Sequence, residues 1–233
     1  MKARQKFKEL LLQDKHSVNS DFVTGDIKKM QDTIESNIKD KDLIDTRRRE
    51  IVNAAVELFV RKGFHQTTVR EIAREFGMSM GALYDYIRTK EDILFLVCDH
   101  IHTTVSNKLK ESVVSEKTGI EILKNAISDY FIIINENQDY MLLLYQETKS
   151  LSKAARKYIF VAENELTSIF EDILKQCIKE KTVRINHRKT KLVANNIMVI
   201  GQMWAFRRWV LRDNYSINSY IKTQTELILK GII

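Results

Sequence analysis

Proline is absent from the 233 residues of this chain, and only seven glycines are present. These two residues provide most of the turns in strand-rich proteins, so their scarcity argues against a sandwich or barrel and leaves long helical stretches uninterrupted. The predicted fold class is all-α. The chain has 44% hydrophobic and 30% charged residues, a composition typical of a packed globular protein and not of a disordered one.

Cysteines and long apolar runs are also scarce. Cys98 and Cys177 are the only cysteines and form no C-x-x-C pair, which excludes the dense disulfide framework of a small secreted domain. The longest apolar run, Ile93 to Cys98, is much shorter than a membrane span. The apolar run behind the basic residues at the start of the chain is too short for a signal peptide. We therefore expect a cytoplasmic protein without a membrane partner.

The sequence shows no sign of catalysis. It contains no G-x-S-x-G, no glycine loop that could hold a phosphate and no H-E-x-x-H. Cys98 and His102 share a helical face, but two ligands are too few for zinc. We expect no catalytic residue, no metal and no cofactor, and an enzyme acting on acyl thioesters is a distant alternative. The net charge of +7 and the pI near 9.2 favour a polyanionic partner such as DNA.

The hydrophobic pattern divides the chain into three parts. Residues 1–44 form an extension that is helical or partly disordered, residues 45–93 a compact helical domain, and residues 94–233 a larger helical domain. The extension has one thin helical stripe, which either docks onto a partner subunit or belongs to a solvated tail: Ile27, Met30, Ile34 and Ile38. The larger domain has predicted helices at about 119–136, 139–149, 152–181, 188–212 and 216–230.

Residues 45–93 have the spacing of a helix-turn-helix. A first helix ends at Gly63, and Thr68 and Glu71 match a capping box that starts a second helix. That helix ends at Gly77, which permits the left-handed backbone of a tight turn, and Ser79 can cap a third helix that runs to about Ile87. In such a motif the third helix lies in the major groove of DNA.

The segment from Arg47 to Leu94 contains three motifs in order: G-F-x-x-T-T-V-R-E-I-A, G-M-S-M-G-A-L-Y-x-Y and T-K-E-D-I-L. This segment, about a fifth of the chain, resembles the DNA-binding domain of the tetracycline-repressor (TetR) family from end to end. The resemblance implies an N-terminal three-helix DNA-binding domain followed by a helical ligand-binding and dimerisation domain. It further implies a homodimer that binds a double-stranded DNA operator, most often a repressor released by a small hydrophobic ligand.

The resemblance also implies which residues contact DNA. They comprise a basic arm, threonines at the start of the second helix, the front of the third helix and two phosphate contacts: Arg47, Arg48, Arg49, Thr67, Thr68, Ser79, Met80, Gly81, Ala82, Tyr84 and Lys90. Two positions depart from the common family pattern, because Met80 replaces a frequent lysine or arginine and Asp85 a frequent histidine. Methionine donates no hydrogen bond to a base, so contact with thymine methyl groups or indirect readout is expected. Tyr86 and Ile87 fit the inward side of the third helix, where they fill the core of the domain.

The predicted helix at 188–212 is apolar on two sides, and such a helix is buried on two sides. One side carries Asn196 and Arg207 on an apolar stripe. Their polar groups need partners, which are either acidic side chains such as Glu147, Glu163 and Glu165 or polar atoms of a ligand. The other side suits a partner subunit, and its residues are the predicted dimer interface: Val199, Gln202, Phe206 and Trp209.

Two further segments, L-Y-Q-E-T-K-S-L at 144–151 and Q-M-W-A-F-R-R-W at 202–209, resemble a TetR subgroup whose regulators respond to fatty-acid or other acyl-CoA thioesters. That resemblance implies an apolar pocket for an acyl tail, with basic residues near the CoA phosphates. The predicted pocket residues are Phe131, Ile134, Leu143, Tyr145, Phe160, Asn196, Met203 and Arg207. A DNA-bound architectural or division-linked factor with the same fold and no small ligand is the alternative.

Overall fold

A computed structural model describes residues 34–112 and 118–233, and within these ranges it contains helices and no strand. The prediction of an all-α fold is therefore confirmed. Along the described part of the chain, none of the helices combines the length and apolar character that crossing a bilayer requires. The described residues pack as two compact units, one formed by 34–103 with 142–162 and the other by 104–112, 118–141 and 163–233. The domain boundaries after residues 44 and 93 remain a prediction.

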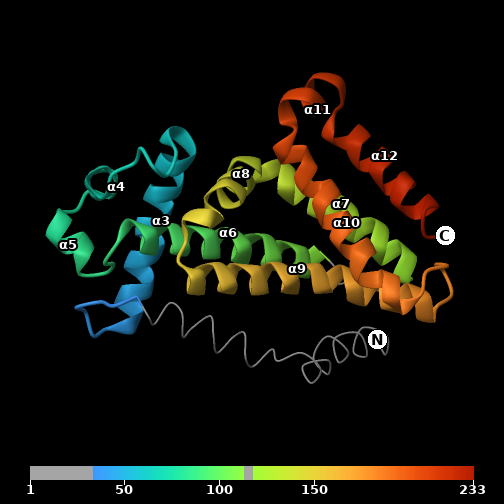
Figure 1. Ribbon diagram of the computed structural model, residues 1–233, viewed down its shortest axis with the longest axis horizontal. Helices are drawn as coiled ribbons and strands as arrows, with labels where there is room; N and C mark the ends of the chain where they lie inside the picture. Colours follow the sequence, from blue (N-terminus) through green and yellow to red (C-terminus); the bar gives the residue numbers. More distant parts are fainter. Residues whose placement is uncertain (1–33, 113–117) are drawn as a thin grey trace. The chain divides into compact units, whose positions relative to one another are not determined.

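The first unit begins with α3 (Lys41–Lys62), α4 (Val69–Phe76), α5 (Met80–Tyr84) and the first part of α6 (Lys90–Ser112), shown in blue to green in Figure 1. Asp40 caps α3 by accepting a hydrogen bond from the backbone of Leu43, so this helix starts four residues before the predicted Asp45. Apolar side chains from all four helices and from the connection after α5 form its core: Ile51, Phe59, Ile72, Leu83, Ile87 and Ile93.

The end of α8 (Gln138–Glu147), a 3₁₀ turn (Thr148–Ser150) and the first part of α9 (Lys153–Lys179) complete this unit. The ring of Tyr158 packs edge-on against Phe95, and its hydroxyl donates a 2.5 Å hydrogen bond to the buried carboxylate of Asp99. His102 is buried on the same helix as Asp99, and burial lowers its pKa to about 4. The imidazole is therefore neutral at pH 7.

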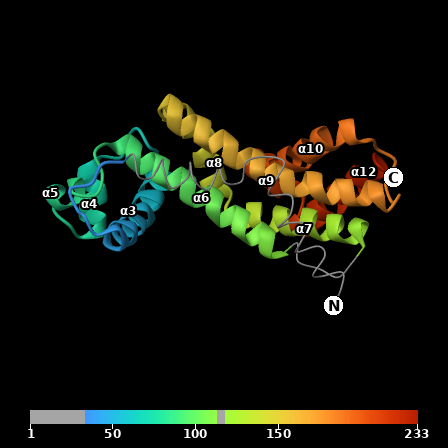
Figure 2. The same cartoon turned by 90° about the horizontal axis from the view of Figure 1, so that it is seen from below.

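The second unit is built around α7 (Gly119–Glu136), on which α10 (His187–Phe206) and α12 (Ile217–Lys230) both pack (Figure 1; Figure 2 gives the view from below). Aromatic rings fill its core, with centroid distances of 5.6 Å between Tyr130 and Phe170 and 5.8 Å between Phe131 and Tyr220. Gly201 allows α10 to approach α7, because a Cβ atom there would lie 2.6 Å from the Tyr130 ring. This contact fixes the two helices against each other.

The helix predicted at 188–212 is interrupted in the structure. The α-helical geometry of α10 ends at Phe206, Arg207 has φ −115° and ψ 25°, and a separate α11 runs over Arg208–Asn214. The hydrophobic pattern continues through this break, which is why periodicity alone predicted one helix. The other predicted helices of this region are confirmed, with differences of a few residues at their ends.

Candidate functional site

The start of α4 has the capping box that the sequence predicts. The Thr68 hydroxyl accepts from the backbone N–H of Glu71, and the Glu71 carboxylate accepts from the backbone N–H of Thr68 at 2.9 Å. Lys62 lies 2.5 Å from the same carboxylate. This ammonium group and the capping hydrogen bonds lower the pKa of Glu71 to about 2, so the box remains intact through the physiological pH range.

The turn between α4 and α5 also has the predicted form. Gly77 has φ +79° and ψ 25°, in the left-handed region that other residues enter at a cost, and its N–H bonds to the carbonyls at the end of α4. Ser79 then caps α5 by accepting from the backbone N–H of Ala82. The third helix is shorter than predicted, because α5 ends at Tyr84. Tyr86 and Ile87 follow it and are buried, as expected.

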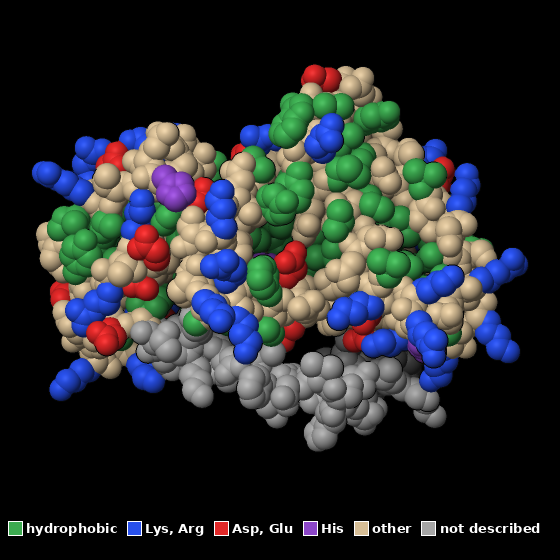
Figure 3. Space-filling view, in the orientation of Figure 1, with side chains coloured by type: hydrophobic (Ala, Val, Ile, Leu, Met, Phe, Trp, Pro, Cys, Tyr) green, Lys and Arg blue, Asp and Glu red, His purple; other side chains and the backbone are tan. Residues whose placement is uncertain are grey.

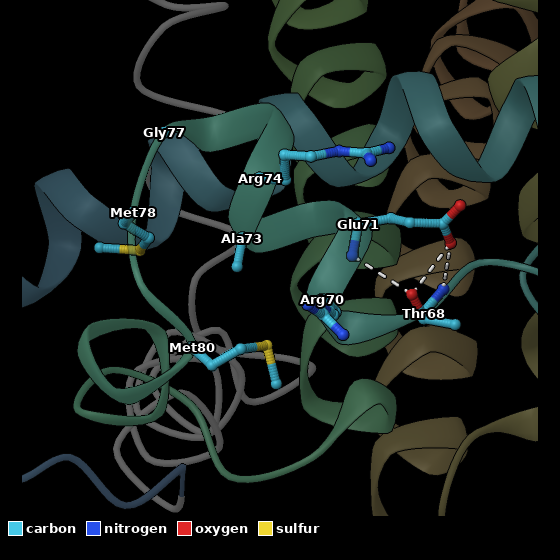
Figure 4. A pocket seen from close by; sticks show the side chains of 8 residues that line it. All are labelled: Thr68, Arg70, Glu71, Ala73, Arg74, Gly77, Met78 and Met80. Atoms are coloured by element: carbon cyan, nitrogen blue, oxygen red, sulfur yellow. Dashed lines mark hydrogen bonds between the residues drawn. The ribbon is translucent and has the colours of Figure 1, made fainter.

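A groove of about 590 Å³ separates α4 from α5 on this face. Figure 4 shows the side chains of Arg70 and Met80 directed toward it from the two helices, whereas Arg74 extends away from Met80. Arg70 and Arg74 are exposed basic residues of α4 that the sequence prediction missed. Their spacing of four residues on a short helix next to the capping box was the signal that could have revealed them.

The front of α5 presents few atoms to its surroundings. Ser79, Gly81 and Tyr84 are exposed, while Met80 and Ala82 are half-buried. A Cβ atom at Gly81 would meet only the Ser79 hydroxyl, at 3.9 Å, so packing within the protein does not require glycine here. Apart from Met80, the residues Ser79 through Ala82 have small side chains, which suits close approach to a base edge, and this remains our interpretation of them.

Two predicted phosphate contacts have other partners in the structure. Thr67 is only 1% exposed and its hydroxyl donates to the carbonyl of Gly63, so of the two threonines only Thr68 presents an exposed side chain. The ammonium of Lys90 donates to the carbonyls of Phe64 and Thr67 at 2.9 and 3.0 Å and lies over the Phe64 ring. Lys90 therefore joins the start of α6 to the loop before α4.

The three arginines of the predicted basic arm differ in their surroundings. Arg47 and Arg49 are exposed, and Arg47 pairs with Glu50. Arg48 is 7% exposed, and its guanidinium donates to the carbonyls of Tyr86 and Ile34 at 3.0 and 2.6 Å. The prediction that Arg48 belongs to a DNA-binding arm is wrong, because a buried guanidinium with intramolecular partners is not available to a phosphate.

The predicted pocket residues are divided between the two units and differ in burial. Phe131 and Ile134 are fully buried in the core of the second unit, and Leu143 is buried in the first. Two aromatic side chains of the set, Tyr145 and Phe160, are exposed on α8 and α9, while Met203 is half-buried. Asn196 and Arg207 are exposed instead of buried, so the expectation that they need buried partners is wrong.

The acidic side chains predicted as those partners have other contacts. Glu147 lies 3.4 Å from His65, and Glu163 accepts a 3.5 Å hydrogen bond from Gln202. Glu165 is half-buried, and desolvation raises the pKa of its carboxyl group. Among the described residues no cluster of three or more metal-ligating side chains occurs. The polar pattern of α10 thus does not define a ligand site by itself.

The helices of the second unit leave a set of large apolar side chains exposed. Val199 on α10 is 59% exposed and Trp209 on α11 is 62% exposed, while Gln202 and Phe206 are half-buried. Leu192 on α10 and Leu227 on α12 are also exposed and were missed by the sequence prediction. Figure 3 shows hydrophobic side chains spread over the face that carries these helices. Val199 and Trp209 therefore remain predicted interface residues.

Comparison with known proteins explains this architecture. Residues 51–97 match the family model "Bacterial regulatory proteins, tetR family", and residues 116–210 match "Tetracyclin repressor-like, C-terminal domain". The chain belongs to the TetR family. This TetR-family chain is 28% identical to the HTH-type transcriptional regulator HbdR of Aromatoleum sp. (strain CIB) over 203 residues. The aligned residues cover 87% of each protein. This chain is thus a transcriptional regulator with both the N-terminal and the C-terminal domain of that family.

Two solved structures of TetR-fold regulators are similar over most of their length. FadR from Bacillus subtilis, in complex with stearoyl-CoA, has a TM-score of 0.67 and 23% identity over 79% of this chain and 99% of its own. AibR, in complex with isovaleryl coenzyme A and operator DNA, has a TM-score of 0.66 and 17% identity over 78% of this chain and 97% of its own. At these identities the likeness establishes the fold.

Replacing Lys90 by methionine tests its role in the TetR-family DNA-binding unit. We expect the loss of its hydrogen bonds to lower the free energy of unfolding by about 1–3 kcal/mol. The slope of log Kd for DNA against log salt is expected to stay unchanged, because Lys90 bonds to the protein itself. Arg70→Met is the matched variant. We expect it to leave the stability unchanged and to reduce the salt slope by about 1. A reduced salt slope for Lys90→Met would instead support the prediction that Lys90 contacts a phosphate.

Proposed function

We propose that this protein is a homodimeric transcriptional repressor that binds a two-fold symmetric DNA operator and releases it when a small hydrophobic ligand binds. The observation that carries the proposal is the complete helix-turn-helix frame. Thr68 and Ser79 cap its two helices, and Gly77 makes the turn. Arg70 is exposed at the groove, and Tyr84 is exposed at the end of α5. In such a frame the front of α5 lies in the major groove and residues at its flanks bind phosphates.

A homodimer is supported by the exposed apolar side chains of α10, α11 and α12. Large exposed apolar patches are uncommon on monomers and mark interaction surfaces. A two-fold interface uses the same surface on both subunits, and helices such as α10 can pair with their own copies. Val199, Trp209, Leu192 and Leu227 are the residues we assign to that interface.

An acyl-CoA thioester is the ligand class we propose. Similar regulators in the TetR family include one crystallised with stearoyl-CoA and one with isovaleryl coenzyme A. The exposed rings of Tyr145 and Phe160 provide apolar surface on α8 and α9 that an acyl chain could cover. A ligand of this kind acts as an inducer if it binds the DNA-free form more tightly than the DNA-bound form.

The test requires the operator, which selection of bound sequences from a random DNA pool would provide. Binding of short-, medium- and long-chain acyl-CoA thioesters is then measured with the protein alone and with operator DNA. A true ligand raises the free energy of unfolding by about 2.7 kcal/mol at about 100 times its Kd. By linkage, it weakens operator binding by the same factor by which DNA weakens ligand binding.

Free coenzyme A and the free fatty acids serve as controls that separate the two halves of the ligand. The acyl-CoA proposal predicts release of the operator by one range of chain lengths and little effect of either half alone. Operator affinity that is unchanged by every thioester would refute the ligand proposal and favour a DNA-bound factor without a small ligand. It would leave the DNA-binding function intact.

A further inference from the structure

The segment before α3 contacts the end of the recognition helix. We call residues 34–40 the N-terminal clasp. The backbone N–H of Asn37 donates to the carbonyl of Asp85 at 3.0 Å, and the hydroxyl of Ser36 donates to the same carbonyl at 2.7 Å. The side-chain amide of Asn37 donates to the Asp85 carboxylate at 3.1 Å. Asp85 is the C-cap of α5, so the clasp binds directly to the end of the helix that faces DNA.

Two arginines extend this contact on either side. The buried guanidinium of Arg48 donates to the carbonyls of Ile34 and Tyr86, which links the clasp to the residue after Asp85. Arg88 donates to the side-chain oxygen of Asn37 and pairs with Glu35 at 3.3 Å. The clasp therefore bonds directly to Asp85 and Arg88, and Arg48 links it to Tyr86; all three residues lie in the connection between α5 and α6.

The surroundings of Ile34 and Ile38 contradict the sequence interpretation of this segment. Residues 34–40 have no helical structure, and Ile34 is buried within the DNA-binding unit of its own chain. The helical stripe predicted through Ile34 and Ile38 is thus wrong at these positions, and Ile27 and Met30 lie outside the described residues. In the described part of the chain, the extension docks on its own recognition helix.

We infer that the clasp is a positioning element that sets the orientation of α5 on DNA, with Asp85 as its anchor. The inference rests on the proposed DNA-reading role of α5. A helix of five residues has too few backbone hydrogen bonds to fix its own direction, so contacts at its end have a large influence. This role would explain why Asp85 replaces the frequent histidine, because its carboxylate accepts a hydrogen bond from the Asn37 amide.

A swap of the two side chains tests this role in the full-length protein. Asn37→Asp places two carboxylates against each other and removes a hydrogen bond, and we expect operator affinity to fall by about tenfold. Asp85→Asn keeps an acceptor oxygen and is expected to bind nearly as well as the wild type. The double variant N37D/D85N restores the hydrogen bond with donor and acceptor exchanged, keeps the net charge of the wild type and should recover operator affinity.

Asn53→Asp is the matched control, because it adds the same charge to an exposed position of α3 in the same unit. Positioning predicts that Asn37→Asp lowers the ratio of operator to random-sequence DNA affinity, while its random-sequence affinity stays within about twofold of Asn53→Asp. Thermal unfolding of all variants shows whether each is folded at the assay temperature. A variant that has only lost its fold would be identified by thermal unfolding. Its unfolding would not account for a change in operator selectivity.

Three results would overturn the inference. They are an Asn37→Asp variant that binds the operator like Asn53→Asp, a double variant as weak as Asn37→Asp, and an equal loss of affinity for both DNAs. Tyr84→Ala separates this failure from a failure of the proposed function. If Tyr84→Ala weakens operator binding and the swap shows no coupling, only the clasp is refuted. If Tyr84→Ala leaves operator binding unchanged, the proposed placement of α5 on DNA is refuted, and the clasp with it.

Discussion

Arg48→Met is expected to lower the free energy of unfolding by about 2–4 kcal/mol, because it removes charge-assisted hydrogen bonds to two carbonyls in a buried site. The methionine side chain retains most of the apolar stem, so the effect isolates the guanidinium. The bonds to Tyr86 and Ile34 hold the clasp and the loop after α5 on α3. Urea and thermal unfolding measure the loss, and operator binding is expected to weaken in parallel.

The neighbouring arginines provide the control for this prediction. Arg47→Met and Arg49→Met alter exposed side chains and are expected to change stability by no more than about 0.5 kcal/mol. If these residues contact phosphates, each variant lowers the salt dependence of DNA binding, which Arg48→Met does not do directly. Equal stability of Arg48→Met and the wild type would mean that the guanidinium is not needed for the fold.

Val199→Asp combined with Leu192→Asp is expected to convert the proposed dimer to monomers and to weaken operator binding by about 100-fold or more. Both side chains are exposed on α10, so the substitutions cost the folded subunit little. In an apolar interface, however, each carboxylate loses its water without gaining a partner. A monomer contacts one half-site at a time, and so the loss in operator affinity is much larger than the loss for a single contact.

Sedimentation or light scattering determines the oligomeric state in the same buffer as the DNA measurement. Lys222→Asp is the control, since Lys222 is exposed on α12 and lies on a different helical face from Leu227. It is expected to remain dimeric. A double variant that stays dimeric, or a wild type that is monomeric at working concentrations, would contradict the assigned interface.

The DNA-binding frame could be predicted because its determinants are local. Thr68 and Glu71 are three residues apart, and Gly77 and Ser79 are two apart, so the capping box and the turn follow from sequence alone. The hydrogen-bond partners of Arg48 and Lys90 could not be predicted in this way. Their partners are carbonyl groups that lie far away in the sequence, and a backbone carbonyl leaves no trace in the pattern of residue types.

The ligand-binding part was predicted less well for a related reason. Helical periodicity shows that α10 has two apolar sides, but it does not show which side the subunit itself covers. Asn196 lies on the stripe assigned to a pocket and is exposed. Gly201, which the sequence analysis did not single out, lies where a Cβ atom would collide with the Tyr130 ring of α7. The position of a residue that lacks a side chain is invisible to a hydrophobic pattern.

The contact at Gly201 restricts how this helical unit can respond to a ligand. The rings of Tyr130 and Phe131 lie where any side chain at position 201 would be, so α10 cannot slide along α7 without forcing these rings into its backbone. Densely packed helices of this kind change position as rigid bodies instead of deforming gradually. A ligand that displaced α7 would therefore carry α10 with it, and the exposed Val199 would move as part of the same body.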